Sequence, residues 1–330
     1  FIALNDNPES ATGALLEAHE GQYDWIIGPL RRETVNTVLQ FPGSTIPLLL
    51  LNRPDAGLQA PAGLPAYSFA LLPEDDAAAS AQQALDAGHR SALVLHSDDS
   101  WGQRVAQAFT EAFTFGGGQV LHRERFNPKE SNHSVQLRTA LGLNEANARQ
   151  RRIRSLLGLP VGFEPVPRQD IDMIFLGARV VQARQLRPQL RFFDAGELPI
   201  FATSQVYSGR EDPRNDRDLD DVQFPSAPWL LDQGQQQPAK SQLRQWFAQL
   251  DSAGSARLFA LGMDVMAVLP YLNFLQNDPA ARLQGAHGQL SVDAQGLVLR
   301  QLQAQQFVDG RVEAMSPAAS QTDDAANPGS

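Results

Sequence analysis

Apolar residues recur along the chain in two patterns, as short continuous runs and at the spacing of one helix face. Residues 24–30 and 45–52 are short, almost continuous apolar runs, and between them Val35, Val38 and Leu39 fall on one face of a helix. Continuous apolar runs of this length are typical of parallel strands that helices cover on both faces. The pattern therefore predicts an α/β fold built on doubly wound parallel sheets.

The same alternation continues beyond Tyr67 and predicts a second lobe of the same kind. A helix should begin at Pro73, since proline is tolerated in a first turn, and should end at Gly88. Helices are also expected through residues 101–113 and 187–193, and the first of these should end at the glycine run 116–118. Further strands are predicted at residues 91–96, 119–126, 171–177, 198–204 and 221–227.

The segment after Trp229 predicts two helices and a hairpin. The first helix should bury one apolar stripe, formed by Leu243, Trp246, Phe247 and Leu250. The second, at residues 255–276, should be kinked by Pro270 and should face inward with Leu258, Leu261, Val265, Leu269 and Leu272. Residues 287–312 alternate with a period of two around a turn at 293–296, which is the pattern of a β-hairpin.

The length of 330 residues suggests about two domains. We expect two lobes, formed by residues 1–71 with 229–285 and by residues 72–228 with 286–314. Residues 127–170 are less regular and predict a surface insertion in the second lobe. The tail at 315–330 is low in apolar residues and is expected to be disordered.

Composition narrows the classes of partner. The chain has 27 basic and 37 acidic residues, and its net charge of −10 argues against nucleic acid as the main partner and against docking of the protein body on anionic lipid. Because the chain has no cysteine, disulfides, thiolate metal sites and cysteine nucleophiles are excluded. The longest apolar run, residues 47–51, is strand-sized, so no membrane-spanning segment or signal peptide is predicted.

Motifs of the common enzymes are absent from the sequence. It has no G-x-S-x-G elbow, no phosphate-loop lysine motif and no H-E-x-x-H, and its six histidines lack the spacing of metal ligands. The acidic run 216–221 matches the first positions of a calcium loop but lacks the glycine and the glutamate that such loops need, so it predicts a solvated acidic turn. We therefore expect a chain without catalytic residues, cofactor or metal.

Two kinds of binding surface are predicted. Ligands of doubly wound sheets bind outside the carboxyl ends of the strands. The candidate cleft-lining residues are Gly28, Pro29, Arg31, Asn52, Arg53, Ser97, Asp98, Ser100, Trp101, Thr203, Ser204 and Tyr207. Candidates for a surface that binds a macromolecular partner are Arg149, Arg151, Arg152 and Arg154 in a helical segment, and Arg210, Asp216, Arg217 and Asp218 in a loop. A solvated face with ordinary ion pairs is the alternative for the arginine-rich helix, and whether the cleft holds a small molecule stays open.

Seven strings resemble, in order, those of one protein family. They are IIGPLRRETVNTVLQ (26–40), LLLLNRPD (48–55), YSFALLPEDDAAASAQQAL (67–85), GQRVAQAFTEAFTFGGG (102–118), DMIFLGARVVQARQLRPQL (172–190), DRDLDDVQFPSAPWLL (216–231) and ARLFALGMDVMAVLPYL (256–272). On these strings the chain resembles the LppC family of outer-membrane lipoproteins, over residues 26–312.

The resemblance implies a type I periplasmic-binding-protein fold, with two lobes joined by three crossovers. It also implies a periplasmic protein that an N-terminal lipid anchor, absent from this sequence, holds at the inner face of the outer membrane, and that binds and activates a class A penicillin-binding protein, a peptidoglycan synthase. The sequence starts at Phe1 within a predicted strand, so most of the first strand–helix unit of the fold is expected to be missing and a sheet edge in the first lobe exposed.

Three functions are therefore weighed. The first is a non-enzymatic regulator that activates the synthase through its surface, and the second is a periplasmic small-molecule receptor, either a solute-binding protein or a sensor. Amino-acid-binding relatives of this fold hold their ligand with small hydroxylated residues after the early strands, where this chain has Pro29, Leu30, Arg31, Asn52 and Arg53. These bulky residues weigh against amino-acid capture in the cleft. An enzyme is the third hypothesis and would need an acid–base pair that sequence alone does not reveal.

Overall fold

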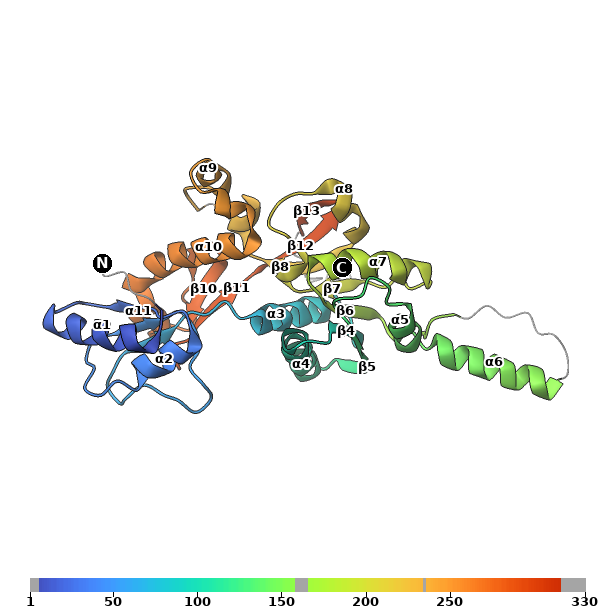
Figure 1. The fold of residues 1–330 in the computed structure, drawn as a ribbon, viewed down its shortest axis with the longest axis horizontal. Coiled ribbons are helices and arrows are strands. Elements are labelled where there is room, and N and C mark those ends of the chain that lie inside the picture. Colours follow the sequence, from blue (N-terminus) through green and yellow to red (C-terminus); the bar gives the residue numbers. More distant parts are fainter. Residues whose placement is uncertain (1–5, 158–165, 234–235, 316–330) are drawn as a thin grey trace, which may run out of the picture. The chain divides into compact units, whose positions relative to one another are not determined.

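The computed structural model describes residues 6–157, 166–233 and 236–315. The chain forms two compact units, drawn in Figure 1: unit 1 comprises residues 1–75 and 226–302, and unit 2 comprises residues 76–225 and 303–330. The chain therefore passes from one unit to the other three times. The predicted tail lies, from residue 316 on, outside the described residues.

The first part of unit 1 is a three-stranded parallel sheet in the order β1-β2-β3, with two helices that pack on each other. Leu15, Val35 and Leu48 meet in one buried apolar cluster, which shows why the apolar face of the second helix turns inward. The elements are α1 Pro8–Glu20, β1 Ile26–Ile27, α2 Arg32–Leu39, β2 Leu48–Leu50 and β3 Ala66–Ser68.

The helix of the first strand–helix unit is present as α1. The expectation that most of this unit is missing was therefore wrong. Asn7 accepts a hydrogen bond from the amide of Ser10, and Pro8 follows in the first turn, so α1 has an ordinary N-terminal cap. The apolar side of α1 is short and was not recognised from the sequence. The strand expected at the start of the chain falls on residues 1–5, outside the described residues.

The second part of unit 1 is helical and ends in an antiparallel sheet of order β11-β10-β9. Its elements are α9 Lys240–Arg244, α10 Ala253–Val268, α11 Leu272–Asn277, β9 Leu283–Gly285, β10 Gly288–Val292 and β11 Val298–Gln301, with single 3-10 turns at Pro228–Leu231, Ala248–Asp251 and Leu269–Tyr271. The hairpin with a turn at residues 293–296 is confirmed, because β10 and β11 pair across it.

Residues 286–302 belong to unit 1, so their assignment to the second lobe was wrong. The reason is local: β10 pairs with β9, and Leu290 and Val298 pack in one cluster with Leu49 and Phe69. Period-two alternation identified the hairpin, but it carries no information about which core the hairpin covers.

Two predictions about the helices of unit 1 were also wrong. The stripe of residues 243–250 does not lie on one helix, because α9 ends at Arg244 and Trp246 lies exposed. The irregularity predicted at Pro270 is confirmed, although it is a 3-10 turn that separates α10 from α11 rather than a kink in one helix. Leu258 is exposed rather than inward. Together these helices form a 25-residue segment, Ala253–Asn277, that is long and apolar enough to cross a membrane by length and composition, a test that core helices of soluble proteins also pass.

Unit 2 has a seven-stranded sheet in the order β13-β12-β8-β7-β6-β4-β5. Its strands are β4 Ser91–Ser97, β5 Gln119–Phe126, β6 Met173–Gly177, β7 Ile200–Ala202, β8 Val222–Ser226, β12 Gln303–Val308 and β13 Arg311–Ala314. The pairs among β4 to β8 are parallel, and β12 and β13 form an antiparallel hairpin. The order β5-β4-β6-β7-β8 is doubly wound, with its topological switch point between β4 and β6.

The helices of unit 2 include α3 Pro73–Asp86, α4 Ser100–Phe115, α5 Ser134–Ala140, α6 Leu143–Leu157, α7 Val180–Phe192 and the short α8 Pro213–Asp216. Phe109 of α4 stacks on Phe113 and on Phe175 of β6, with ring centroids 5.2 and 4.0 Å apart. The predicted helix end at residues 116–118 is confirmed, because Gly116 caps α4 and Gly117 has a φ of +87°. The segment predicted as an irregular insertion contains α5 and α6, and residues 158–165 of it lie outside the described residues.

Candidate functional site

The switch point of the unit 2 sheet is occupied by a network of the protein's own polar side chains. Asp99 follows β4 and caps α4, accepting hydrogen bonds from the amide of Gly102 at 2.6 Å and from the hydroxyl of Ser97 at 2.9 Å. Arg179 follows β6, stands at the N-cap position of α7 without a side-chain capping bond, and donates to Asp99 at 3.0 Å. Burial opposes ionisation of Asp99, but these hydrogen bonds prevail and lower its pKa.

Trp101 completes this network. Its ring lies 4.2 Å from the guanidinium carbon of Arg179, an ordinary cation–π distance. Of the candidates in this loop, Ser97 is buried, Trp101 is half-buried, and Asp98 and Ser100 are exposed. Asp98 pairs with Arg125 at 3.2 Å. The charges at the switch point therefore neutralise one another, and the candidates Ser97 and Trp101 belong to a closed arrangement.

The candidates after β7 are buried. Thr203 and Ser204 begin a 3-10 turn, and the hydroxyl of Ser204 donates to Asp76 of α3. Tyr207 packs its ring against Phe224 and Phe307, with centroids 6.4 Å away in both cases. Tyr207 is thus a core residue of unit 2, because its ring packs among other buried aromatic rings.

The carboxyl edge of the unit 1 sheet is also tied together internally. The cis peptide bond Gly28–Pro29 follows β1, and the amide of Arg31 donates to Asp6 at 2.7 Å. Asn52 donates to the carbonyl of Leu30 at 2.8 Å. Arg53 makes two hydrogen bonds to Asp75, at 2.9 and 3.1 Å. The candidates of unit 1 therefore bond to neighbouring residues of the chain itself at this edge.

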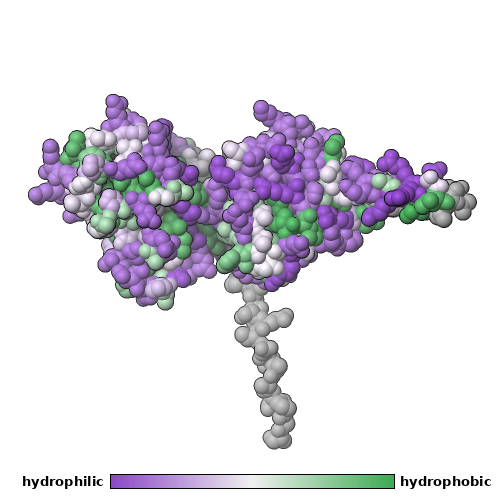
Figure 2. All heavy atoms as spheres, turned by 90° about the horizontal axis from the view of Figure 1, so that it is seen from below, coloured by the Kyte–Doolittle hydropathy of each residue, from purple (hydrophilic) through white to green (hydrophobic). Residues whose placement is uncertain are grey.

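The arginines of α6 form the most exposed of the predicted surfaces. Arg149, Arg151, Arg152 and Arg154 are all exposed, and so are the apolar side chains of Ile153 and Leu156. Figure 1 shows α6 extending away from the sheet of unit 2, with its start beside α5. In Figure 2 the projecting end that holds α6 carries both hydrophilic and hydrophobic residues. The helix thus offers a basic, partly apolar surface of its own.

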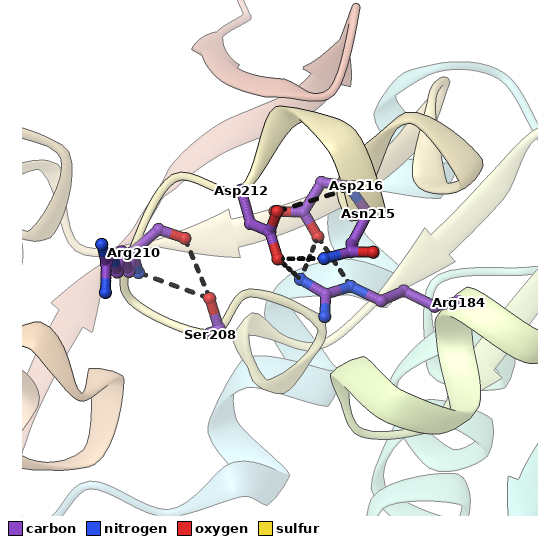
Figure 3. A network of polar contacts seen from close by, with 6 residues as sticks. All are labelled: Arg184, Ser208, Arg210, Asp212, Asn215 and Asp216. Carbon is purple, nitrogen blue, oxygen red and sulfur yellow. Dashed lines mark hydrogen bonds and ion pairs between the residues drawn. The ribbon is translucent and has the colours of Figure 1, made fainter.

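The second predicted surface, the loop of residues 210–221, is only partly exposed. Arg210, Arg217 and Asp218 are exposed, but Asp216 is buried and its carboxylate accepts from Arg184 of α7 at 2.7 and 3.0 Å. Figure 3 shows Arg184 reaching toward Asp216 and Asp212 from α7. Burial raises the pKa of Asp216, against the opposing effect of Arg184. The prediction that Asp216 is a solvated contact residue was therefore wrong.

Arg179 and Arg184 are among the residues of these networks that were missed from the sequence. Arg179 follows the strand at residues 171–177, so the rule that selected the ends of the other strands would have found it. Arg184 lies inside a helix, and its pairing with Asp216 joins residues 32 positions apart. No local pattern marks such a pair, because the contact depends on how α7 crosses the loop. Among the residues that the structure describes, no group of three or more histidine, aspartate or glutamate side chains is arranged to hold a metal ion.

Comparison with solved structures defines the class of fold. The C-domain of LpoA from Haemophilus influenzae, described as a regulator of PBP1A, superposes with a TM-score of 0.71 at 20% identity, over 93% of this chain and 86% of that one. A candidate branched-chain amino acid ABC transporter protein from Chromobacterium violaceum superposes with a TM-score of 0.63 at 23% identity, over 92% and 86%. The chain is therefore an α/β protein of the periplasmic-binding-protein-like class.

The sequence comparisons identify the family. The model of the LppC lipoprotein family matches residues 9–310, and the chain belongs to this family. The penicillin-binding protein activator LpoA of Photobacterium profundum is 29% identical over 311 residues, which cover 92% of this chain and 48% of that protein. The LpoA of Vibrio cholerae is 29% identical over 290 residues, 85% of this chain and 46% of that protein. The chain thus spans about half the length of the curated relatives that it matches.

Proposed function

We propose that this chain is the part of a penicillin-binding protein activator that contacts the synthase, and that it acts by binding rather than by catalysis. The observation that carries the proposal is the match of nearly the whole chain to relatives named as activators of a penicillin-binding protein. The partner would be a class A enzyme. It would act in the periplasm, held by a lipid anchor at the inner face of the outer membrane. Membership of a lipoprotein family supports this location.

The basic helix α6 is the surface that we assign to the synthase. From Ala146 to Leu157 the helix has four arginines and no acidic residue, although the chain as a whole has a net charge of −10. The last turns, residues 151–156, are exposed on every side. An isolated helix of this length is marginal in water, so a partner that packs against it would also stabilise it. An acidic surface with room for Ile153 and Leu156 fits its chemistry.

Activation requires that the partner's active state binds this surface more tightly than its resting state, since only differential affinity shifts an equilibrium. The receptor hypothesis has less support. At the switch point of unit 2, where a ligand of this fold would bind, Arg179 and Trp101 are already engaged with each other and with Asp99.

The test uses the purified chain and the class A synthase of the same organism. Glycan polymerisation and crosslinking are measured with and without the chain, and stimulation is expected. The double variant R151E/R152E should lose most of this stimulation, whereas R32E/R311E, with the same change of charge at two exposed arginines on other elements, should retain it. If the wild-type chain neither binds nor stimulates, the proposed function is wrong; if R151E/R152E stimulates fully, the assignment to α6 is wrong.

A further inference from the structure

Unit 2 has a hollow at the edge of its sheet opposite to the switch point. Its volume is about 770 Å³, and it lies beside the amino ends of β7 and β8. Small-molecule sites usually enclose about 300–1,000 Å³. The residues that matter for its chemistry are Arg187 and Arg191 of α7, Glu197 and Asp221 in the loops, and Gln223 and Gln306 of the sheet.

Arg187 is a buried cation whose described hydrogen bonds go to carbonyls rather than to a carboxylate. Its side chain is only 3% exposed, and it donates to the carbonyls of Gly196 at 2.8 Å and Asp220 at 3.4 Å. Its ion pair with Asp221 is long, at 3.7 Å, and Asp221 is 71% exposed. By contrast Arg184, one turn earlier on α7, holds the buried Asp216 at 2.7 Å. A buried guanidinium whose described ion pair is 3.7 Å long can still accept a closer anion.

Arg191 adds a second positive charge at the same place. It lies four residues after Arg187 on α7 and donates to the same carbonyl, that of Asp220, at 3.3 Å. Two like charges with this spacing on a helix repel each other. Burial, and then the charge of Arg191, lower the pKa of Arg187, and the carboxylates of Asp221, Glu197 and Asp220 oppose this only in part. An anion that bridged the two guanidinium groups would relieve this repulsion.

A simple anion does not suit the whole hollow, however. Asp194, Glu197 and Asp221 bring three carboxylates to its wall. A ligand therefore needs a positive charge as well as a negative one. Gln223 and Gln306 extend from the sheet and have amide groups that both donate and accept hydrogen bonds, which suits a peptide group.

We infer that this hollow binds a short peptide with free amino and carboxyl ends, its carboxylate on Arg187 and Arg191 and its ammonium group among the carboxylates. The volume exceeds what one amino acid fills, which favours a peptide over a free amino acid. This site is separate from α6 and from the switch point, and it goes beyond the proposed function. If the chain does not bind the synthase, the inference about the peptide still stands, because the two proposals concern different sites.

The test is calorimetric titration of the chain with the dipeptide alanylalanine, its N-acetyl derivative and its C-terminal amide. The free dipeptide should bind, and each blocked derivative should bind at least about tenfold more weakly because it lacks one charged contact. R191Q and E197Q should each weaken binding of the free dipeptide by about tenfold. R214Q, at an exposed arginine of α8 that does not line the hollow, should bind as the wild type does.

Circular dichroism and thermal unfolding establish that each variant is folded before titration. Two variants with opposite charge changes keep the test informative if one of them fails to fold. No saturable binding of alanylalanine up to about 10 mM would overturn the inference. Equal binding of the free and blocked peptides, or full affinity in both folded R191Q and E197Q, would overturn it too.

Discussion

The two edges of the unit 2 sheet differ in how closely their charged side chains are paired. At the carboxyl edge, Asp99 and Arg179 pair at 3.0 Å, and Trp101 covers the guanidinium. At the amino edge, Arg187 is nearly fully buried, yet its ion pair is long and an open hollow lies beside it. The fold usually binds ligands at the carboxyl edge. Here the charged side chains at the carboxyl edge pair with each other. The buried arginine that would attract a ligand lies at the amino edge.

The helix α7 shows the same contrast over a single turn. Arg184 holds Asp216, a carboxylate that is almost fully buried, whereas Arg187 donates to carbonyls. The first arrangement is a short ion pair, and in the second the ion pair is 3.7 Å long and the hydrogen bonds go to carbonyls. Substitutions at these positions measure how far the contrast holds.

The largest effect is expected from R184M. The substitution leaves the buried carboxylate of Asp216 without its cation, which should lower the free energy of unfolding by about 3–5 kcal/mol. Burial already raises the pKa of Asp216 above its unfolded value, and removal of Arg184 should raise it further. The folded variant therefore takes up a proton more readily than the unfolded chain, so it should regain stability relative to wild type as pH falls from 7 to 5. Urea unfolding at both pH values measures this, and a loss below 1 kcal/mol at pH 7 would contradict it.

A smaller loss is expected from R187M. The substitution removes two hydrogen bonds to carbonyls beside the hollow, where water can replace the donor, and it removes a buried charge whose described ion pair is long. The expected cost is about 1–2 kcal/mol. Urea unfolding of R187M beside R184M gives the comparison directly. If R187M is the more destabilised of the two, Arg187 is the better-compensated arginine and the contrast is wrong.

At the carboxyl edge, D99A should cost about 1–2 kcal/mol, because α4 loses its N-terminal cap and Arg179 loses its partner. D99N should retain much of the cap and lose only the partly exposed ion pair, at a cost below about 1 kcal/mol. Thermal unfolding of the two variants separates cap from charge. Equal losses would mean that the ion pair, rather than the cap, dominates at this edge.

The smallest effect at neutral pH is expected from H96Q, next to the same edge. His96 is buried; its Nδ1 lies 2.9 Å from the carbonyl of Ser97, and its Nε2 accepts from Arg123 at 3.0 Å, an arrangement that needs a neutral ring. Burial, and also the charges of Arg123 and Arg125, lower its pKa in the folded chain. The stability that this contributes is present above the unfolded pKa of about 6.5 and is lost as pH falls below it.

H96Q should therefore show a shallower loss of stability with acid than the wild type does. Unfolding free energies at pH 8, 7, 6 and 5 test this. His133, whose pKa is lowered mainly by burial, titrates in the same direction and should leave part of the slope in place. Identical slopes in wild type and H96Q would show that His96 does not titrate as described.

Much of the fold could be predicted from the sequence because its signals are local. The strand at residues 119–126 and the helix that begins at Pro73 depend on apolar runs and on end residues, and both are found as expected. The hairpin was recognised, but its residues up to 302 were assigned to the wrong unit, because the pattern of a strand does not encode the core on which it packs. Leu258 and Trp246 were expected to be buried, yet they are exposed, since an apolar side chain alone does not identify the buried face of a helix.

The candidate site was predicted less well, for a physical reason. The ends of strands are visible in the sequence, so Asn52, Arg53 and Ser97 were found where the sheets end. The role of each residue depends on partners far along the chain, as with Asp216 and Arg184 or Asp99 and Arg179. The hollow beside Arg187 was not predicted at all, because α7, two loops and two strands build it together.

The central claim is that the chain acts by binding a synthase through the basic helix α6. The most direct measurement is the affinity of the chain for its cognate class A penicillin-binding protein at about 50 and about 300 mM salt, where exposed charges are screened to different degrees. We predict measurable binding that weakens as salt rises, and that R151E/R152E abolishes at both concentrations. Binding by R151E/R152E with the affinity and salt dependence of the wild type, or no binding by the wild type at either concentration, would contradict the account.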